Sequence, residues 1–337
     1  MTKKTIMIHW DAHACLPQHP LADFAPVRRL HAAGVNYVSL NVGADMNPLS
    51  QVMSVIAGYR ATIAADPARY ALVSSVDDII QAAADGRMAI GFDLEGALPL
   101  LEQPDMVALY AQLGVRQIHF AYNRNNSVAD GCHDTPRGLT PLGVRMVEAV
   151  NEHGILMDCS HTGRRCSLEI MHVASQPVIF SHANPDTLAP HGRNVTDEQI
   201  RACAATGGVV CVSGLSFFLG SARPDAADVA RHVAYIADLV GVQHVGIGLD
   251  ICFQQPGLDD TPPGGFDPAY WWPAHAGYRA DAPPTFTPPE VWRELPAALR
   301  RAGMRESEAE LVLGRNMMRV AQQVWGAPAA AALARAA

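Results

Sequence analysis

The sequence lacks most of the features that would assign it to a specialised class. Among its 337 residues there is no run of about 18 uncharged apolar residues, so we expect no membrane-spanning helix. The 7 cysteines include no CxxC pair, and the 25 lysines and arginines do not cluster within a chain of net charge −8. We therefore expect no disulfide framework, no nucleic-acid partner and no membrane partner.

We also expect no secretory signal, because the start MTKKTIMIHWDAH carries only a short apolar stretch. Scattered cysteines without an export signal favour reduced thiols and a cytoplasmic location. Two features are abundant instead. Hydrophobic residues make up 49% of the chain, which is enough for a large core, and there are 14 histidines.

Eight short β-type runs alternate with helical stretches along the chain. Strands separated by helices form parallel crossover units, and eight such units can close into a (β/α)₈ TIM-type barrel. A doubly wound open sheet is the rival fold, but no GxGxxG or Walker sequence follows any run. We predict an α/β fold of the barrel type. Its strands are expected at 5–10, 36–42, 88–95, 116–123, 154–161, 177–182, 207–215 and 244–250.

No second domain and no internal repeat is evident, so we predict a single barrel domain over 1–337. One segment stands out, at about 254–289, because it is rich in proline and aromatic residues and contains PPGGFDPAYWWPAH. It is too long for a simple turn. We expect it to form a lid loop or a packed loop over the mouth of the barrel.

Residues that bind metals or move protons stand at the expected carboxyl ends of the strands, where barrels of this kind build their sites. Imidazole and carboxylate donors suit zinc and its neighbours. A carboxylate between two ligand sets can bridge two ions that activate one shared water, and Glu95 occupies such a place. The pattern predicts a metal centre at this end of the barrel. The residues are His13, Cys15, Glu95, Tyr122, His161, His182 and Asp250.

The other histidines carry a simpler interpretation, because a single histidine near a strand or helix is more often structural than a ligand. Those in helical stretches are expected to face solvent, and those inside strands are expected in the core. His191, upstream of Arg193, is left open. The helical set is His31, His153, His172 and His232, and the strand set is His9 and His119.

Seven motifs, in order, resemble those of the membrane (renal) dipeptidase family of zinc metallopeptidases. They are DAHACLP, LEG, GLTPLG, MDCSHTG, VIFSHANP, GRNVTDE and GIGLD, and the similarity extends to GRNMMRVAQQVW near the C-terminus. The resemblance implies a (β/α)₈ barrel of the metal-dependent hydrolase type, with two zinc ions that hydrolyse small dipeptides, and a homodimer. His13 matches a ligand of one metal, Glu95 the carboxylate that bridges both, and His161 and His182 the ligands of the second.

The resemblance also implies roles in substrate binding. Arg193 matches the arginine that grips the terminal carboxylate of the substrate, which suits a guanidinium because it pairs a carboxylate bidentately. Asp250 matches the acid that passes a proton to the leaving nitrogen. Tyr122, next to Asn123, stands where a histidine usually contacts the substrate carbonyl. A phenol can donate to a developing oxyanion, or its ring can pack against the lid.

The clearest departure is Cys15, which replaces the aspartate of the family's His-x-Asp motif. A thiolate binds zinc well, so Cys15 can preserve a two-metal site, but an unligated cysteine also behaves as a small buried hydrophobe. A third alternative is that His9 and Asp11, also spaced His-x-Asp, replace the pair. A further departure is LEGALP, which lacks the family's Gly-His pair after Glu95.

Three functions follow, and they differ in the number of metal ions. Two zinc ions favour a dipeptidase that cleaves the amide of a dipeptide or a dipeptide-like small molecule. One ion, held by His161 and His182, favours a hydrolase of another amide or a lactone. No ion favours a non-hydrolytic barrel that serves as a binding protein. The metal set at His13, Cys15 and Glu95 discriminates among them.

Overall fold

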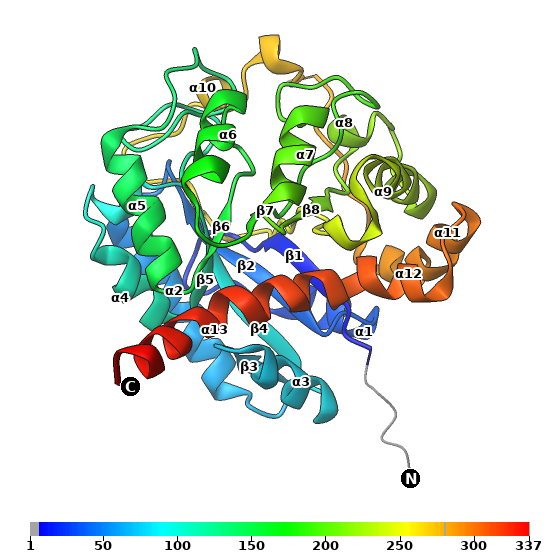
Figure 1. Cartoon of the computed structure of the whole chain (residues 1–337), viewed down its shortest axis with the longest axis horizontal. Coiled ribbons are helices and arrows are strands. Elements are labelled where there is room, and N and C mark those ends of the chain that lie inside the picture. The colour runs from blue at the N-terminus through cyan, green and yellow to red at the C-terminus, as the bar shows by residue number, and fades with distance from the viewer. Residues whose placement is uncertain (1–6, 280, 337) are drawn as a thin grey trace.

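Ten parallel strands and a surrounding layer of helices make up the described part of the chain, residues 7–279 and 281–336 of a computed structural model (Figure 1). The strands are β1 (Trp10–Cys15), β2 (Tyr37–Ala44), β3 (Tyr70–Leu72), β4 (Met88–Glu95), β5 (Val115–His119), β6 (Leu156–Asp158), β7 (Val178–Phe180), β8 (Val209–Val212), β9 (Val245–Ile247) and β10 (Ile251–Cys252). The α-helices are α1 (Ala25–Ala32), α2 (Leu49–Ala65), α3 (Val76–Ala84), α4 (Met106–Leu113), α5 (Pro141–Glu152), α6 (Arg164–Val173), α7 (Asp197–Ala205), α8 (Ser216–Leu219), α9 (Ala226–Val240), α10 (Pro268–Trp271), α11 (Leu295–Arg301), α12 (Glu306–Glu310) and α13 (Asn316–Ala336). Shorter helical turns lie at η1 (Leu98–Leu100), η2 (Val242–His244), η3 (Ala274–Ala276), η4 (Pro289–Arg293) and η5 (Leu311–Arg315).

The strands close into a barrel. Their order is β10-β1-β2-β4-β5-β6-β7-β8-β9, with β3 paired outside this path to β4. Because β10 follows β9 after only residues 248–250, the two form one interrupted strand. It pairs with β8 at Val245–Ile247 and with β1 at Ile251–Cys252. This double pairing confirms the predicted (β/α)₈ fold.

Local signals account for where several helices begin. Thr140 accepts a hydrogen bond from the backbone N–H of Gly143, and Pro141 occupies the first helical position of α5. Thr196 and Gln199 form a capping box at the start of α7. Each of these helices therefore begins directly after the loop at the carboxyl end of a strand, which leaves that loop available for site residues.

The C-terminal helix α13 closes the opposite end of the barrel, where it crosses the ribbon in red in Figure 1. Trp325 packs 5.6 Å from the ring of Trp10 and 6.2 Å from that of Tyr37, and its Nε1 donates to the carbonyl of Arg116. These partners stand at or near the starts of β1, β2 and β5. The helix therefore covers the amino end of the barrel, which leaves the carboxyl end available for a functional site.

The predicted first strand at 5–10 is wrong, because β1 runs from Trp10 to Cys15; residues 5 and 6 lie outside the described residues. Polar residues such as Asp11 read as the end of a strand, yet Asp11 and His13 are both 0% exposed inside the barrel. The strand at 88–95 has the predicted bounds. The prediction at 116–123 is too long, because β5 ends at His119.

His232 was expected to face solvent, and that expectation is wrong. It is 0% exposed, and its Nε2 lies 3.2 Å from the carbonyl oxygen of Leu219. Helix α9 packs against α7, α8 and α11, so it has more than one buried side. His172 is exposed as expected.

The segment 254–289 contacts loops at the carboxyl end of the barrel. Asn123 donates through Nδ2 to the carbonyl of Trp271 at 3.0 Å, and Trp272 donates through Nε1 to the hydroxyl of Tyr122 at 3.1 Å. The segment thus packs on the loop that follows β5. The single-domain assignment with a lid loop stays a prediction.

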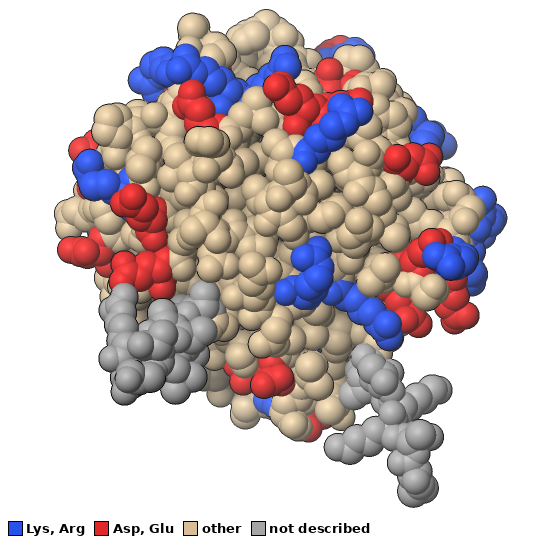
Figure 2. Space-filling model, viewed as in Figure 1, with Lys and Arg blue, Asp and Glu red and all other residues tan. Residues whose placement is uncertain are grey.

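Acidic and basic side chains are interspersed on the face shown in Figure 2. No helix within the described ranges is both long and apolar enough to cross a membrane.

Asp11 stabilises the barrel where it closes, between β1 and the interrupted strand formed by β9 and β10. Its Oδ1 accepts from the backbone N–H of Leu249 at 2.9 Å, and its Oδ2 accepts from Nε1 of Trp292 at 3.1 Å. Replacing Asp11 with alanine leaves both buried donors without an acceptor. We expect Asp11→Ala to lower the free energy of unfolding by about 2–4 kcal/mol, measured by urea denaturation. The exposed Asp238 on α9 serves as the control, and an equal loss in Asp238→Ala would contradict this role.

Candidate metal centre

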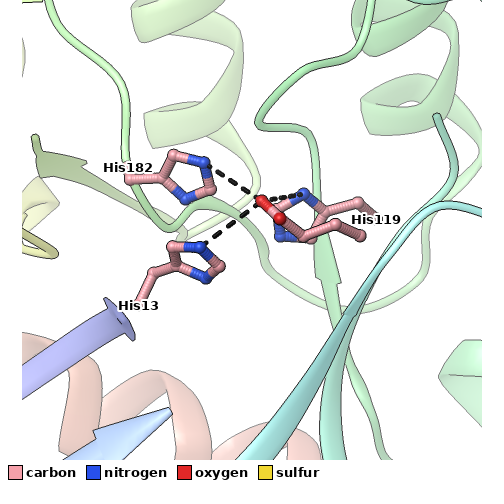
Figure 3. Close-up of side chains that lie close together, drawn as sticks. His13, His119 and His182 are labelled. Atoms are coloured by element: carbon pink, nitrogen blue, oxygen red, sulfur yellow. Dashed lines mark ion pairs between the residues drawn. The ribbon is translucent and has the colours of Figure 1, made fainter. Parts of the chain in front are cut away.

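The carboxylate of Glu95, at the end of β4, lies at the centre of a group of four imidazoles. Its Oε1 lies 3.2 Å from Nε2 of His161, 3.4 Å from Nε2 of both His13 and His182, and 4.0 Å from Nδ1 of His119. Figure 3 shows three of these rings around the carboxylate. Glu95 is only 5% exposed, and Oε1 has no hydrogen-bond partner among the described residues.

This arrangement fits a bound cation. Burial raises the pKa of Glu95 to about 7, although His13 and His119 act against the rise. Burial, followed by nearby positive groups, holds the pKa values of His161 and His182 well below their usual range. Their imidazoles are therefore neutral and offer lone pairs. Ligand atoms of His13, Glu95, His119 and His182 lie within 4.8 Å of one another, so one ion can reach several of them.

On one side of Glu95, β1 contributes His13 and Cys15. The Sγ of Cys15 lies 3.4 Å from Nε2 of His13, and Oδ1 of Asp250 lies 3.9 Å from the same nitrogen. The other ring nitrogen, Nδ1, lies 3.2 Å from Oδ1 of Asp93. A carboxylate behind an imidazole fixes the ring and directs its second nitrogen toward a metal.

The alternative pair His9 and Asp11 does not reach Glu95. Asp11 bonds to Trp292 and Leu249, and the ring of His9 stacks on Trp292 at 5.9 Å. The structure thus brings His13, with the sulfur of Cys15 beside its ring, to the carboxylate.

On the other side, His161 and His182 point their Nε2 atoms at each other, 2.9 Å apart. Their Nδ1 atoms are occupied, that of His161 by Oδ1 of Asn123 at 2.7 Å and that of His182 by Oγ of Ser181 at 2.8 Å. Because Asn123 Oδ1 can only accept, Nδ1 of His161 carries the proton. Its Nε2 therefore presents a lone pair toward Glu95.

Three residues of the site have left-handed backbone conformations that side chains rarely adopt. The φ angles are +60° for Asn123, +64° for His161 and +59° for Asp250. Such conformations cost about 1–3 kcal/mol each and cluster at functional sites. They turn the chain sharply after β5, β6 and β9, which directs these side chains back over the mouth of the barrel.

His119 is the residue that the sequence reasoning assigned to the core and not to the site. It is buried as expected, but it is the last residue of β5, where its Nε2 lies 2.7 Å from Oδ2 of Asp158. The register of the sheet pairs His119 with Glu95 of β4 on one side and with Asp158 of β6 on the other. A signal existed: Gln117 and His119 are polar at alternate positions, which in a barrel strand marks the interior face.

Asp158 and His119 stabilise each other's charged forms. Although burial opposes it, the His119 imidazole lowers the pKa of Asp158 to about 2. The same pair raises the pKa of His119 against the effect of burial. Asp93 stands behind His13 in a similar position, with its Oδ1 3.2 Å from Nδ1 of the ring.

Tyr122 lies between the metal centre and the 254–289 segment. Its ring stacks on His161 with centroids 4.3 Å apart, and its hydroxyl accepts from Trp272. The ring thus packs within the site, and its hydroxyl contacts the segment expected to act as a lid.

Arg193 is 2% exposed and extends toward the same end of the barrel. Its Nη2 donates to the carbonyl of His182 at 2.9 Å, while its Nε has no partner among the described residues. A cavity of about 200 Å³ is lined in part by Arg193, Cys132 and His191. His191, whose role the sequence left undecided, accepts through Nδ1 a hydrogen bond from the backbone N–H of Arg193 and so helps to position that residue.

Residues 45–262 match the sequence profile of the membrane dipeptidase family (peptidase family M19). The chain is 27% identical over 261 residues to dipeptidase verJ of Clonostachys rogersoniana, covering 75% of this chain and 63% of that protein. It is 34% identical over 189 residues to the uncharacterized dipeptidase C965.12 of Schizosaccharomyces pombe, covering 53% and 45%. The chain thus spans less than two thirds of the length of these curated relatives.

Solved structures share the fold. An amidohydrolase from Pseudomonas aeruginosa superposes with a TM-score of 0.83 at 24% identity, over 95% of this chain and 97% of that one. A metallopeptidase from Rhodobacter sphaeroides, liganded with a phosphinate mimic of the dipeptide L-Ala-D-Ala, gives 0.76 at 19% identity, over 95% and 99%.

A divalent metal is expected to stabilise the protein through Glu95. At a metal concentration of 100 times Kd, binding to the folded state alone adds about 2.7 kcal/mol. We expect zinc to raise the Tm of the wild type in a thermal-shift titration, and Glu95→Gln to reduce that rise strongly because the central ligand loses its charge. The exposed Glu148 on α5 provides the matched control, Glu148→Gln. Equal zinc responses in the two variants would exclude Glu95 from metal binding.

Proposed function

The chain belongs to the membrane dipeptidase family, peptidase family M19, and from this premise we propose that it is a zinc-dependent dipeptidase. It hydrolyses the amide bond of a dipeptide or a dipeptide-like small molecule. The observation that carries the proposal is the buried Glu95 oxygen, with four imidazole nitrogens between 3.2 and 4.0 Å away.

Two groups of residues are proposed to hold two zinc ions that share Glu95. His13 and Cys15 serve the first, together with His119, whose Nδ1 faces Glu95 while Asp158 holds its other nitrogen. His161 and His182 serve the second. Neutral imidazole, thiolate and carboxylate are all donors that zinc accepts.

Bound zinc would polarise the substrate carbonyl and lower the pKa of the attacking water. Asp250 is proposed to accept a proton and pass it to the leaving nitrogen. Burial raises its pKa against the influence of His13 and Arg193, which brings a carboxylate closer to the range where it can exchange protons near neutral pH. Ser213 donates to Oδ2 of Asp250 at 3.3 Å and holds the side chain in place.

Arg193 is proposed to bind the terminal carboxylate of the substrate. Its buried guanidinium uses one nitrogen for the His182 carbonyl and keeps Nε free of partners among the described residues. A buried guanidinium with unused donors suits a carboxylate ligand. Tyr122 and Asn123 are proposed to contact the rest of the substrate.

The proposed substrate has a D-residue at its carboxyl end, by analogy with the metallopeptidase from Rhodobacter sphaeroides that binds a mimic of L-Ala-D-Ala. The expected homodimer and the cytoplasmic location also stay predictions. All 7 cysteines are free thiols, which is consistent with the second.

Hydrolysis of L-Ala-D-Ala by the zinc-loaded protein tests the function. We expect turnover of the free acid and a loss of kcat/KM of about 100-fold for the carboxamide, because one buried charge pair contributes about 2–5 kcal/mol. Arg193→Met should raise KM for the free acid and abolish the discrimination. Arg145→Met, an exposed arginine on α5, is the control.

The second candidate is a hydrolase with one metal at His161 and His182, favoured by the 2.9 Å separation of their Nε2 atoms. It predicts no dipeptide turnover at saturating zinc, together with hydrolysis of a lactone or another amide. That outcome would replace the dipeptidase assignment.

A further inference from the structure

Two cysteines face each other across the seam at which the barrel closes. Cys15 is the last residue of β1, Cys252 is the last residue of β10, and the parallel register pairs them directly. Adjacent strands lie about 4.8 Å apart, within the range of about 4.4–6.8 Å over which a disulfide joins two Cα atoms. Residues paired at this spacing meet the Cα separation that a disulfide requires.

Backbone hydrogen bonds hold the pair in register on both sides. The N–H of Asp250 donates to the carbonyl of His13 at 3.1 Å, and the N–H of Phe253 donates to the carbonyl of Cys15 at 2.9 Å. Sequence separation hides this proximity, because the closure of the barrel alone brings the two strands together.

Accessibility distinguishes this pair from the other cysteines. Cys252 is exposed and Cys15 is partly exposed, whereas Cys159, Cys166, Cys203 and Cys211 are buried. Cys132 is also partly exposed, but its sulfur contacts Asn123 and His133 rather than a second thiol.

We propose that Cys15 and Cys252 are a redox modification site that forms an intrachain disulfide when the protein meets a small-molecule disulfide such as oxidised glutathione. The exposed Cys252 loses its proton, attacks one sulfur of the oxidant and releases one glutathione. Cys15 then loses its proton, and its sulfur displaces the second glutathione from Cys252. Both protein thiols are oxidised, one glutathione disulfide is reduced to two glutathione molecules, and the two protons go to those products.

The disulfide has a consequence for the metal centre, and this consequence alone rests on the proposed function. Cys15 Sγ lies 3.4 Å from Nε2 of His13, within the group proposed to hold the first zinc. A sulfur in a disulfide carries no negative charge and is a poor zinc ligand. Oxidation would therefore remove one donor from that ion and leave His161 and His182 unchanged.

Peptide mapping by mass spectrometry tests the proposal. The full-length protein, metal-free and zinc-loaded, is treated with oxidised glutathione, alkylated and digested without reductant. We expect a cross-linked peptide joining Cys15 to Cys252 and an intact mass lower by two hydrogen atoms. Cys252→Ser should abolish the cross-link, and the substitution is at an exposed position that leaves the core intact. Cys132→Ser, the control at the other partly exposed thiol, should retain it.

Absence of the Cys15–Cys252 cross-link from both wild-type samples would overturn the proposal. An unchanged loss of thiols in Cys252→Ser would overturn it as well. Zinc bound to Cys15 should slow the cross-link by about tenfold or more, since the ligated sulfur is withheld from exchange. Equal rates with and without zinc would contradict Cys15 as a ligand, and so contradict the proposed first metal set. The disulfide proposal is judged separately, by the presence or absence of the cross-linked peptide.

Discussion

The buried carboxylate of Glu95 is the constraint that organises the carboxyl end of this barrel. Burial disfavours its charge, Oε1 has no hydrogen bond among the described residues, and the nearby imidazoles of His13 and His119 act in the opposite direction. Four imidazoles surround it, and those of His161 and His182 are held neutral by burial. A cation between them satisfies the carboxylate and the ring nitrogens together.

The remaining polar residues of the interior orient the rings. Asp93 stands behind His13, Asp158 behind His119 and Asn123 behind His161, so each ring has one nitrogen fixed and the other directed at Glu95. The opposite end of the barrel has no such function. There α13 packs Trp325 against Trp10, and its polar contacts, such as that of Trp325 with the carbonyl of Arg116, are structural. Because the packing of α13 is at the amino end and the site is at the carboxyl end, the strained, charged residues of the site lie apart from the packing that closes the barrel.

The sequence was sufficient to predict the barrel and the strand at 88–95, because a continuous buried strand between two helices has a clear pattern. It was insufficient for β1 and for His119. Both errors have one cause: site residues were sought only beyond the ends of the predicted strands, whereas His13 and His119 belong to β1 and β5 themselves. His232 shows the converse error, since helical spacing does not reveal that α9 is packed on several sides. The neighbours of Cys15 could not be foreseen either, because strand closure determines them.

Metal content per chain, measured by inductively coupled plasma mass spectrometry on the wild type and Cys15→Ala in parallel, tests the central claim most directly. A centre in which Glu95 is shared by two ions predicts about two equivalents of zinc in the wild type and about one in the variant. One equivalent or fewer in the wild type, unchanged in Cys15→Ala, would contradict the two-metal centre and reduce Cys15 to a packing residue.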